Sequence, residues 1–298
     1  MENINTCIVC GSLKSLKLYE CIDKVSSNEK FNIVYCQECS FQYTQNRPTL
    51  LKAGKYYLSD KYVSHTDNKK SFIISLYRTI RNLNLKWKLK IINKLNGNKN
   101  GYILDYGCGL GNFLSYCKEN GWLTNGMDIS EEARREVKKR YDINVYENKE
   151  LFNTNKNKYD IITLWHVLEH VYNIDETIEG LKNSIKEEGY ILIALPNNNS
   201  YDALKYKENW DAYDVPRHIW HFNKKSVEKL FLKHGLILID TKPMVFDSYY
   251  VSIRSEMHKG NKFHFIYGMF WGFISHLKAI YSKEYSSQLY IFKKNESI

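Results

Sequence analysis

The sequence predicts an α/β protein with a doubly wound, mostly parallel sheet and a small cysteine-rich unit in front of it. Two observations lead to this prediction. From Tyr102 onward, short apolar segments alternate with stretches of helical periodicity, an order typical of parallel strands joined by helices. Before that alternation begins, two C-x-x-C pairs form a separate pattern near the N-terminus. We therefore expect one sheet-based domain with an appended metal-binding knuckle.

The composition is that of a globular protein with an ordinary core. The chain has 298 residues, of which 43% are hydrophobic, enough for one substantial core and a small additional unit. A net charge of +10 favours an anionic partner such as a nucleic acid, a nucleotide-linked substrate or a membrane surface. The alternative is a simple compositional bias, because the lysines are scattered. No apolar leader follows Met1, so we expect a cytoplasmic protein with reduced cysteines.

Residues 1–50 are expected to form a zinc-binding knuckle domain. Two C-x-x-C pairs, separated by 25 residues, supply four thiolates, and Gly11 eases the first turn. Each pair brings two sulfurs within reach of one tetrahedral ion. Because four thiolates leave no open coordination position, we expect a structural Zn²⁺ that folds the N-terminus. The ligands would be Cys7, Cys10, Cys36 and Cys39.

Residues 51–98 are predicted to be a linker followed by a covering helix. The first part is polar and aromatic. From Ser71 to Leu95, apolar residues recur at helical spacing, so this segment should cover the sheet edge before the first strand. The apolar positions are Ile73, Leu76, Tyr77, Ile80, Leu83, Trp87, Ile91 and Leu95.

The most informative segment is a glycine-rich turn that begins at Asp105. It follows a predicted strand at 102–106 and precedes a helix, and it carries Gly107, Gly109 and Gly111. Glycines let bare backbone approach a ligand, and the start of the helix directs unpaired N–H groups at it. The next strand, 123–128, ends in Asp128, whose carboxylate suits a ribose diol. These features indicate a nucleoside-cofactor site at the carboxyl ends of parallel strands.

The spacing D-x-G-x-G-x-G resembles motif I of class I S-adenosylmethionine (SAM)-dependent methyltransferases, whereas dinucleotide enzymes favour G-x-G-x-x-G. The segments at 159–171 and 189–197 look like the fourth and fifth strands of that family. The resemblance covers roughly residues 80–245. It implies a Rossmann-like class I methyltransferase fold with a seven-stranded sheet over 99–298, in which 243–285 form a helical insertion.

The resemblance also implies which residues bind the cofactor. The acid and the three glycines of the turn would lie beside the methionine part of SAM. The second-strand acid would bind the ribose hydroxyls, the next residue would contact the adenine, and a tryptophan at the end of the fourth strand would pack against the cofactor. This set is Asp105, Gly107, Gly109, Gly111, Asp128, Ile129 and Trp165.

His166 is the first catalytic candidate. Methyl transfer is an in-line displacement, so the protein must align the acceptor and remove a proton when the acceptor is a hydroxyl. His166 ends the fourth strand and would act as a general base or acceptor ligand, with a positioning hydrogen bond as the alternative. The pattern H-x-x-E-H at 166–170 also occurs in zinc peptidases, but the apolar strand running into it argues against that chemistry. In the family, Glu169 and His170 usually serve the local structure.

A second group of candidates follows the fifth strand, at Asp214, Arg217 and His218. These side chains offer a proton acceptor and an anion clamp around Pro216. The segment resembles the PRH loop of a methyltransferase subgroup found with glycan and natural-product biosynthesis. His218 is the preferred second catalytic residue. For Arg217, the alternative is that it pairs with Asp214 and fixes the loop.

The expected function is methyl transfer from SAM to a small-molecule or saccharide-type acceptor. The cysteine pairs also resemble zinc-bearing sugar C-methyltransferases, from which this chain departs at 55–70, where His65 is the one matching feature. An RNA (rRNA or tRNA) methyltransferase is the enzymatic alternative, although aromatics interleaved with arginines are missing from the zinc unit. A non-catalytic scaffold protein with this fold is the third hypothesis, and the intact glycines argue against it.

The segment 263–280 is the one candidate for a membrane element. It is rich in apolar and aromatic residues, but His264, His276 and Lys278 interrupt it, and it barely reaches the length of a bilayer. We expect a buried or interfacial helix, with a peripheral membrane contact as the alternative and no transmembrane segment.

Overall fold

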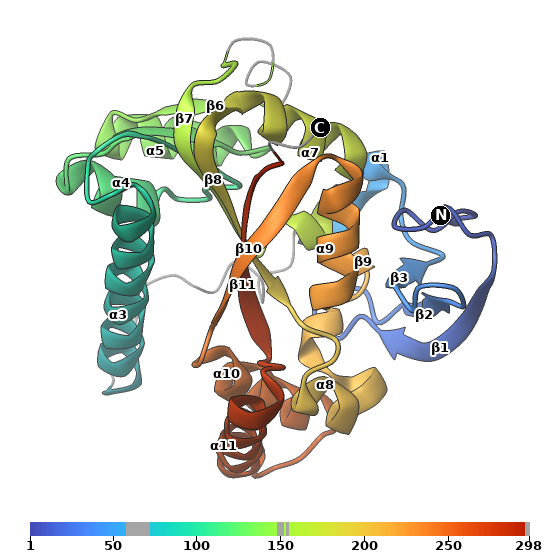
Figure 1. Ribbon diagram of the computed structural model, residues 1–298. Coiled ribbons are helices and arrows are strands. Elements are labelled where there is room, and N and C mark those ends of the chain that lie inside the picture. Colours follow the sequence, from blue (N-terminus) through green and yellow to red (C-terminus); the bar gives the residue numbers. More distant parts are fainter. Residues whose placement is uncertain (58–71, 148–151, 153–154, 296–298) are drawn as a thin grey trace.

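The computed structural model describes residues 1–57, 72–147, 152 and 155–295, and in these ranges the chain forms two sheets (Figure 1). His65 and the rest of the expected linker at 58–71 lie outside the described residues. The larger sheet has seven strands in the order β10-β11-β8-β7-β4-β5-β6, and the smaller has four in the order β1-β2-β3-β9.

The larger sheet confirms the predicted doubly wound, mostly parallel architecture. Strands β4, β5, β6, β7 and β8 pair with one another in parallel, whereas β11 pairs antiparallel with both β8 and β10. The strand order reverses next to β4, so the loops that follow β4 and β7 meet at one edge of the sheet. The strands are β4 Tyr102–Tyr106, β5 Leu123–Met127, β6 Asn144–Tyr146, β7 Tyr159–Trp165, β8 Ile185–Pro196, β10 Leu236–Pro243 and β11 Ser287–Lys294.

Helices cover both faces of this sheet (Figure 1). Because side chains alternate along a strand, Ile103 packs with α3 and α4, while its neighbour Leu104 packs with α7 and α9 on the opposite face. Two helix starts are fixed by side chains: Ser130 accepts from the Ala133 N–H at α5, and Asn223 forms a capping box at α9. These helices are α3 Phe72–Leu95, α4 Asn112–Glu119, α5 Glu131–Tyr141, α7 Ile174–Ser184 and α9 Lys224–Lys233.

The smaller sheet is antiparallel and combines the N-terminal region with a distant strand. Strand β9 pairs with β3, so residues that follow β8 in sequence complete the sheet of the cysteine-rich region. The partition into 1–50, 51–98 and 99–298 stays a prediction, and β9 shows that the first and last of these parts share one sheet. The strands of the smaller sheet are β1 Ser15–Ile22, β2 Lys30–Cys36, β3 Gln42–Gln45 and β9 Trp220–His221. Two short helices follow β3, α1 Leu50–Ala53 and η1 Gly54–Tyr57.

Several short helices connect β7, β8 and β9 around the carboxyl ends of the strands. A single turn, η2, follows β7, and three more lie between β8 and β9. The catalytic candidates lie beside these helices: His166 precedes η2, and Asp214, Arg217 and His218 follow η4. Their bounds are η2 Leu168–His170, α8 Tyr201–Tyr206, η3 Lys207–Asn209 and η4 Asp211–Tyr213.

The predicted insertion between the last two strands is a pair of helices, α10 Asp247–His258 and α11 His264–Ser282 (Figure 1). They pack closely because α11 turns Gly268 and Gly272 toward α10, where an added Cβ would collide with the backbone of Ile253 and Tyr249. The opposite face of α11 is exposed. Among the helices that the structure describes, none is sufficiently long and apolar to cross a bilayer.

Candidate functional site

The glycine-rich turn joins β4 to α4 and has all three glycines at positive φ, +78° at Gly107, +52° at Gly109 and +72° at Gly111. An added Cβ at Gly107 would meet Val167, and one at Gly111 would meet Val137. At Gly109 it would meet no atom of the described residues within 4 Å. Gly107 and Gly111 are therefore needed for packing, whereas Gly109 borders open space in which a ligand can approach the backbone.

Asp128 follows β5 and is tied to the turn by hydrogen bonds. Its Oδ2 accepts from the Gly109 N–H at 2.8 Å, and its Oδ1 accepts from the Ser130 N–H at 2.9 Å. A carboxylate accepts about four hydrogen bonds, so lone pairs remain for ligand hydroxyls. The next residue, Ile129, is 83% exposed and free to contact a planar group. The predicted ribose and adenine residues thus lie beside Gly109.

Asp105 lies in β4, just before the turn, and does not face solvent. It is 3% exposed, and its Oδ1 accepts a hydrogen bond from the Thr163 hydroxyl at 2.7 Å. Burial raises the pKa of Asp105 to about 6, against the opposing effects of Thr163 and the positive charge of Lys88. The carboxylate thus connects β4 to β7 just before the turn begins.

Lys88 on α3 is a site residue that our reading of the sequence missed. Its Nζ lies 3.8 Å from the ring centroid of Trp165 and 5.5 Å from that of Phe113. Burial lowers the pKa of Lys88 to about 8, against the attraction of Asp105 and Asp247. In the sequence, Lys88 stands three residues after Leu85 and four before Ile92, a spacing that puts the three side chains on the same, sheet-facing side of the helix. This spacing could have identified Lys88 as a residue close to the site.

His166 begins the turn after β7, at a φ of +56°. Its Nδ1 lies 3.6 Å from Glu169 Oε1, and its Nε2 lies 3.3 Å from Asp247 Oδ2 on α10. Burial alone would lower the pKa of His166, but the carboxylates of Asp247 and Glu169 raise it to about 10. A ring that is protonated at neutral pH has no lone pair with which to accept a proton. This arrangement favours the positioning alternative over the general base.

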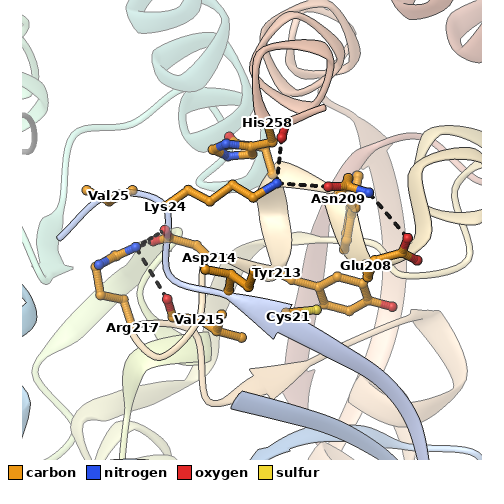
Figure 2. Close-up of a pocket in the computed structure, with 13 residues that line it drawn as sticks. Cys21, Lys24, Val25, Glu208, Asn209, Tyr213, Asp214, Val215, Arg217 and His258 are labelled. Carbon is orange, nitrogen blue, oxygen red and sulfur yellow. Dashed lines mark hydrogen bonds and ion pairs between the residues drawn. The ribbon is translucent and has the colours of Figure 1, made fainter. Parts of the chain in front are cut away.

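Arg217 is buried, with 2% exposure, and binds carboxylates of the chain itself (Figure 2). Its Nε and Nη2 donate to Asp214 at 2.9 and 2.5 Å, and Nη2 also donates to Asp23 at 3.1 Å. Its Nη1 donates to the Tyr56 carbonyl at 3.1 Å. These contacts connect the loop after β8 to the N-terminal region. They favour the loop-fixing alternative for Arg217 and Asp214.

The cavity beside this ion pair is small (Figure 2). Its volume is about 20 Å³, room for one water molecule. Lys24 crosses it and donates to Asn209 at 2.8 Å and to the His258 carbonyl at 2.6 Å. An acceptor molecule does not fit there, so this cavity belongs to the packing interface between β1, η3 and α10.

His218 comes together with Glu169 and His170, two residues that the sequence reading assigned to local structure. The rings of the two histidines are nearly perpendicular, at 79°, with centroids 4.6 Å apart. His218 Nε2 lies 4.0 Å from Glu169 Oε1. One ligand atom from each of the three residues falls within 4.8 Å of the others. Because His218 is 48 positions from His170 in sequence, the spacing did not reveal this cluster.

The four predicted zinc ligands also meet at one point. Cys7 Sγ lies 3.5 Å from Cys39 Sγ, Cys10 Sγ lies 3.5 Å from Cys36 Sγ, and all four sulfurs are within 4.8 Å of one another. Zn–S bonds of about 2.3 Å in a tetrahedron separate sulfurs by about 3.8 Å. All seven cysteines are free thiols. The donor set and its spacing therefore fit a tetrahedral metal ion.

Comparisons with known proteins agree with the fold and the turn. The profile of the methyltransferase-domain family matches residues 77–241, more than half of the chain. The chain is 31% identical over 125 residues to the ubiquinone biosynthesis O-methyltransferase of Glaesserella parasuis serovar 5 (strain SH0165). The matched region covers 38% of this chain and 53% of that relative. The chain thus spans about half the length of this curated relative.

Among solved structures, the fold is similar to that of magnesium protoporphyrin IX methyltransferase from Synechocystis PCC 6803 with bound S-adenosylhomocysteine. The TM-score is 0.50 at 14% sequence identity, covering 77% of this chain and 90% of the other. The chain belongs to the methyltransferase-domain family. This membership agrees with the predicted SAM-dependent methyltransferase and argues against the scaffold alternative.

Proposed function

We propose that this enzyme transfers the methyl group of SAM to a hydroxyl of a small-molecule or saccharide-type acceptor, in glycan or natural-product biosynthesis. The observation that carries the proposal is the open backbone face at Gly109, tied to Asp128 at the carboxyl ends of parallel strands. The relative named an O-methyltransferase supports an oxygen acceptor. When bound, SAM supplies an electrophilic methyl group on a positively charged sulfur.

The residues around the turn fit each part of SAM. The N-terminus of α4 has no side-chain cap, so its N–H groups are available to the methionine carboxylate. Lys88 adds a positive charge against the ring of Trp165, 3.8 Å from its centroid. Asp128 would accept hydrogen bonds from the ribose hydroxyls, and the exposed side chain of Ile129 would cover the adenine. Asp105, bonded to Thr163 of β7, would hold the end of the strand from which the turn starts.

The acceptor would bind beside the turn after β7 and the loop that carries His218. Val167 in that turn lies against Gly107, so the candidates adjoin the cofactor turn. We assign His218 to the acceptor, because its Nδ1 donates to the Ala212 carbonyl at 2.8 Å and its Nε2 is left as the lone-pair nitrogen. His166, Asp214 and Arg217 would position this group. They do so through the carboxylate contacts described above.

We also propose that the four-cysteine cluster holds a structural Zn²⁺. The knuckles are closed by matching turns, in which the Gly11 N–H donates to the Cys7 carbonyl and the Ser40 N–H donates to the Cys36 carbonyl, both at 2.8 Å. The ion would stabilise the small sheet and, through β9, the loop that leads to His218. It would take no part in the reaction, because four thiolates leave no open position.

The exposed face of α11 is a third element of the proposal. Large apolar side chains on this helix, including Phe265 at 61% and Ile266 at 66%, remain uncovered by the described residues. Lys278 on the same helix and Lys262 just before it supply positive charge. We propose that this face makes a peripheral contact with a membrane surface, which would bring the site close to apolar acceptors.

The experiment that tests the function is methyl transfer to an unfractionated acceptor pool. The purified enzyme is incubated with SAM carrying a deuterated methyl group and a host metabolite extract, and products are detected by mass spectrometry. The proposal predicts a small-molecule or saccharide product that carries the label. A labelled RNA, with retention on RNA that weakens steeply with salt, would instead establish the RNA alternative. Transfer to neither pool, with SAM bound, would overturn the assignment of acceptor class.

A further inference from the structure

Glu169 is a buried carboxylate without a hydrogen-bond partner. It is 1% exposed, and among the described residues neither of its oxygens has a partner within hydrogen-bonding distance. Two ring nitrogens approach Oε1 without reaching hydrogen-bonding distance, His166 Nδ1 at 3.6 Å and His218 Nε2 at 4.0 Å. The protonated ring of His166 balances part of this charge from 3.6 Å, but it makes no hydrogen bond to the carboxylate. Taking a carboxylate out of water without hydrogen bonds is costly, so such a group ordinarily also has a ligand.

The two histidines beside Glu169 are oriented by backbone carbonyls. His170 Nδ1 lies 2.9 Å from the Arg217 carbonyl, and His218 Nδ1 lies 2.8 Å from the Ala212 carbonyl. A carbonyl accepts only, so each ring carries its proton on Nδ1 and keeps the Nε2 lone pair. Metal-ligating histidines typically show this arrangement, since the carbonyl fixes both the tautomer and the ring plane.

The surrounding loops hold the three side chains together. Glu169 and His170 lie in η2, and the Ile219 N–H donates to the Glu169 carbonyl at 2.9 Å, which ties the loop of His218 to that turn. Arg217, immediately before His218, is fixed by its buried contacts with Asp214 and Asp23. The cluster is thus a built arrangement in which two loops are connected by backbone and side-chain bonds.

We propose that Glu169, His170 and His218 bind a divalent metal ion next to the SAM turn. Two imidazole nitrogens and one carboxylate suit borderline divalent ions such as Mn²⁺, Fe²⁺, Co²⁺ or Zn²⁺ and leave coordination positions open. The inference deepens the proposed function, on which it rests for its location beside the cofactor.

The ion would prepare the acceptor for transfer. An acceptor hydroxyl that fills an open position is acidified by the positive charge and releases its proton to solvent water. The oxygen lone pair then forms the new C–O bond, while the electrons of the breaking C–S bond stay on sulfur and give a neutral thioether. His218 would therefore act on the acceptor through the ion, and a separate protein base is not required.

A buried histidine outside the cluster provides a matched control. His234 also faces two carboxylates, with its Nδ1 2.7 Å from Glu179 and its Nε2 2.8 Å from Asp175. Both of its nitrogens are engaged in hydrogen bonds, so neither is free for an ion. A substitution at His234 removes a histidine of similar surroundings and should leave metal binding unchanged.

The test is Mn²⁺ binding measured by electron paramagnetic resonance on the full chain, loaded first with one equivalent of Zn²⁺ to fill the thiolate cluster. Thiolates disfavour Mn²⁺, so the signal reports the second cluster. We expect one bound Mn²⁺ in the wild type, at least tenfold weaker binding in Glu169→Gln and His218→Asn, and wild-type binding in His234→Asn. Equal Mn²⁺ affinity in all four proteins, or no bound Mn²⁺ in the wild type, would overturn the proposal.

Two further measurements keep the result interpretable. Pulsed resonance on the wild type should show ¹⁴N coupling from two imidazoles, and its absence would refute the site even where a variant fails to fold. Calorimetric titration with SAM should give wild-type affinity in Glu169→Gln. If SAM does not bind to the wild type while Mn²⁺ does, the methyltransferase proposal fails and the metal site stands; the reverse outcome removes the metal site alone.

Discussion

Replacing Arg217 by methionine should destabilise the fold by about 3 kcal/mol. The guanidinium makes two hydrogen bonds to Asp214, at 2.9 and 2.5 Å, and bonds to charged partners contribute about 1.5–3 kcal/mol each. The lower end of that range applies, since the Asp214 side chain is 23% exposed and regains some water. Asp23 loses less stabilisation than Asp214 when the guanidinium is removed, because it keeps hydrogen bonds from Ser26 and Ser27. The sum agrees with the cost of breaking a buried ion pair.

The assay is urea unfolding, with Arg135→Met as control. Arg135 forms an exposed pair with Glu131 on α5, so its loss should change the free energy of unfolding by less than about 0.5 kcal/mol. The Michaelis constant for the acceptor is measured on both variants. A large increase in that constant with unchanged unfolding would refute our reasoning, because it would show that Arg217 clamps an anionic acceptor, the role first expected from the sequence.

Three further predictions concern the zinc cluster, the buried acid and α11. Cys36→Ala should lose the bound zinc and lower the unfolding midpoint, whereas Cys21→Ala, at a buried cysteine outside the cluster, should keep the metal; equal zinc content by mass spectrometry would contradict the cluster. Asp105 has its folded-state pKa raised to about 6, so the folded state binds its proton more tightly and loses stability as the pH rises from about 4 to 6. This loss of about 3 kcal/mol should be missing in Asp105→Asn, and identical pH profiles of unfolding for the two proteins would disprove it. Ile266→Glu on α11 should reduce co-sedimentation with anionic vesicles while leaving SAM affinity unchanged; undiminished co-sedimentation would remove the membrane contact.

Patterns that are local in sequence allowed much of the fold to be predicted. Strand β4 has the expected bounds of 102–106, because apolar residues and the glycine turn delimit it on both sides. Strand β8 begins earlier than expected, at Ile185 rather than at Gly189. The polar run after Ile185 hid the start of this strand, although Ile185 already pairs with Tyr159 in β7.

Features that depend on distant parts of the chain were beyond the sequence. Strand β9 consists of two residues, too short for any periodicity, and is defined only by its pairing with β3. The cluster of Glu169 and His218 likewise arises because two loops meet at the carboxyl ends of the strands. The cysteine pairs and the glycine turn were predictable, since each is complete within a short segment.

The most direct test of the account is calorimetric titration of the enzyme with SAM. The wild type should bind one equivalent, and Asp128→Ala should bind about ten- to a hundredfold more weakly, because the ribose hydroxyls lose a charged acceptor worth about 1.5–3 kcal/mol. The variant also loses the carboxylate that holds the Gly109 N–H, which works in the same direction. No heat of binding in the wild type, or equal affinity in the two proteins, would contradict the cofactor site described here.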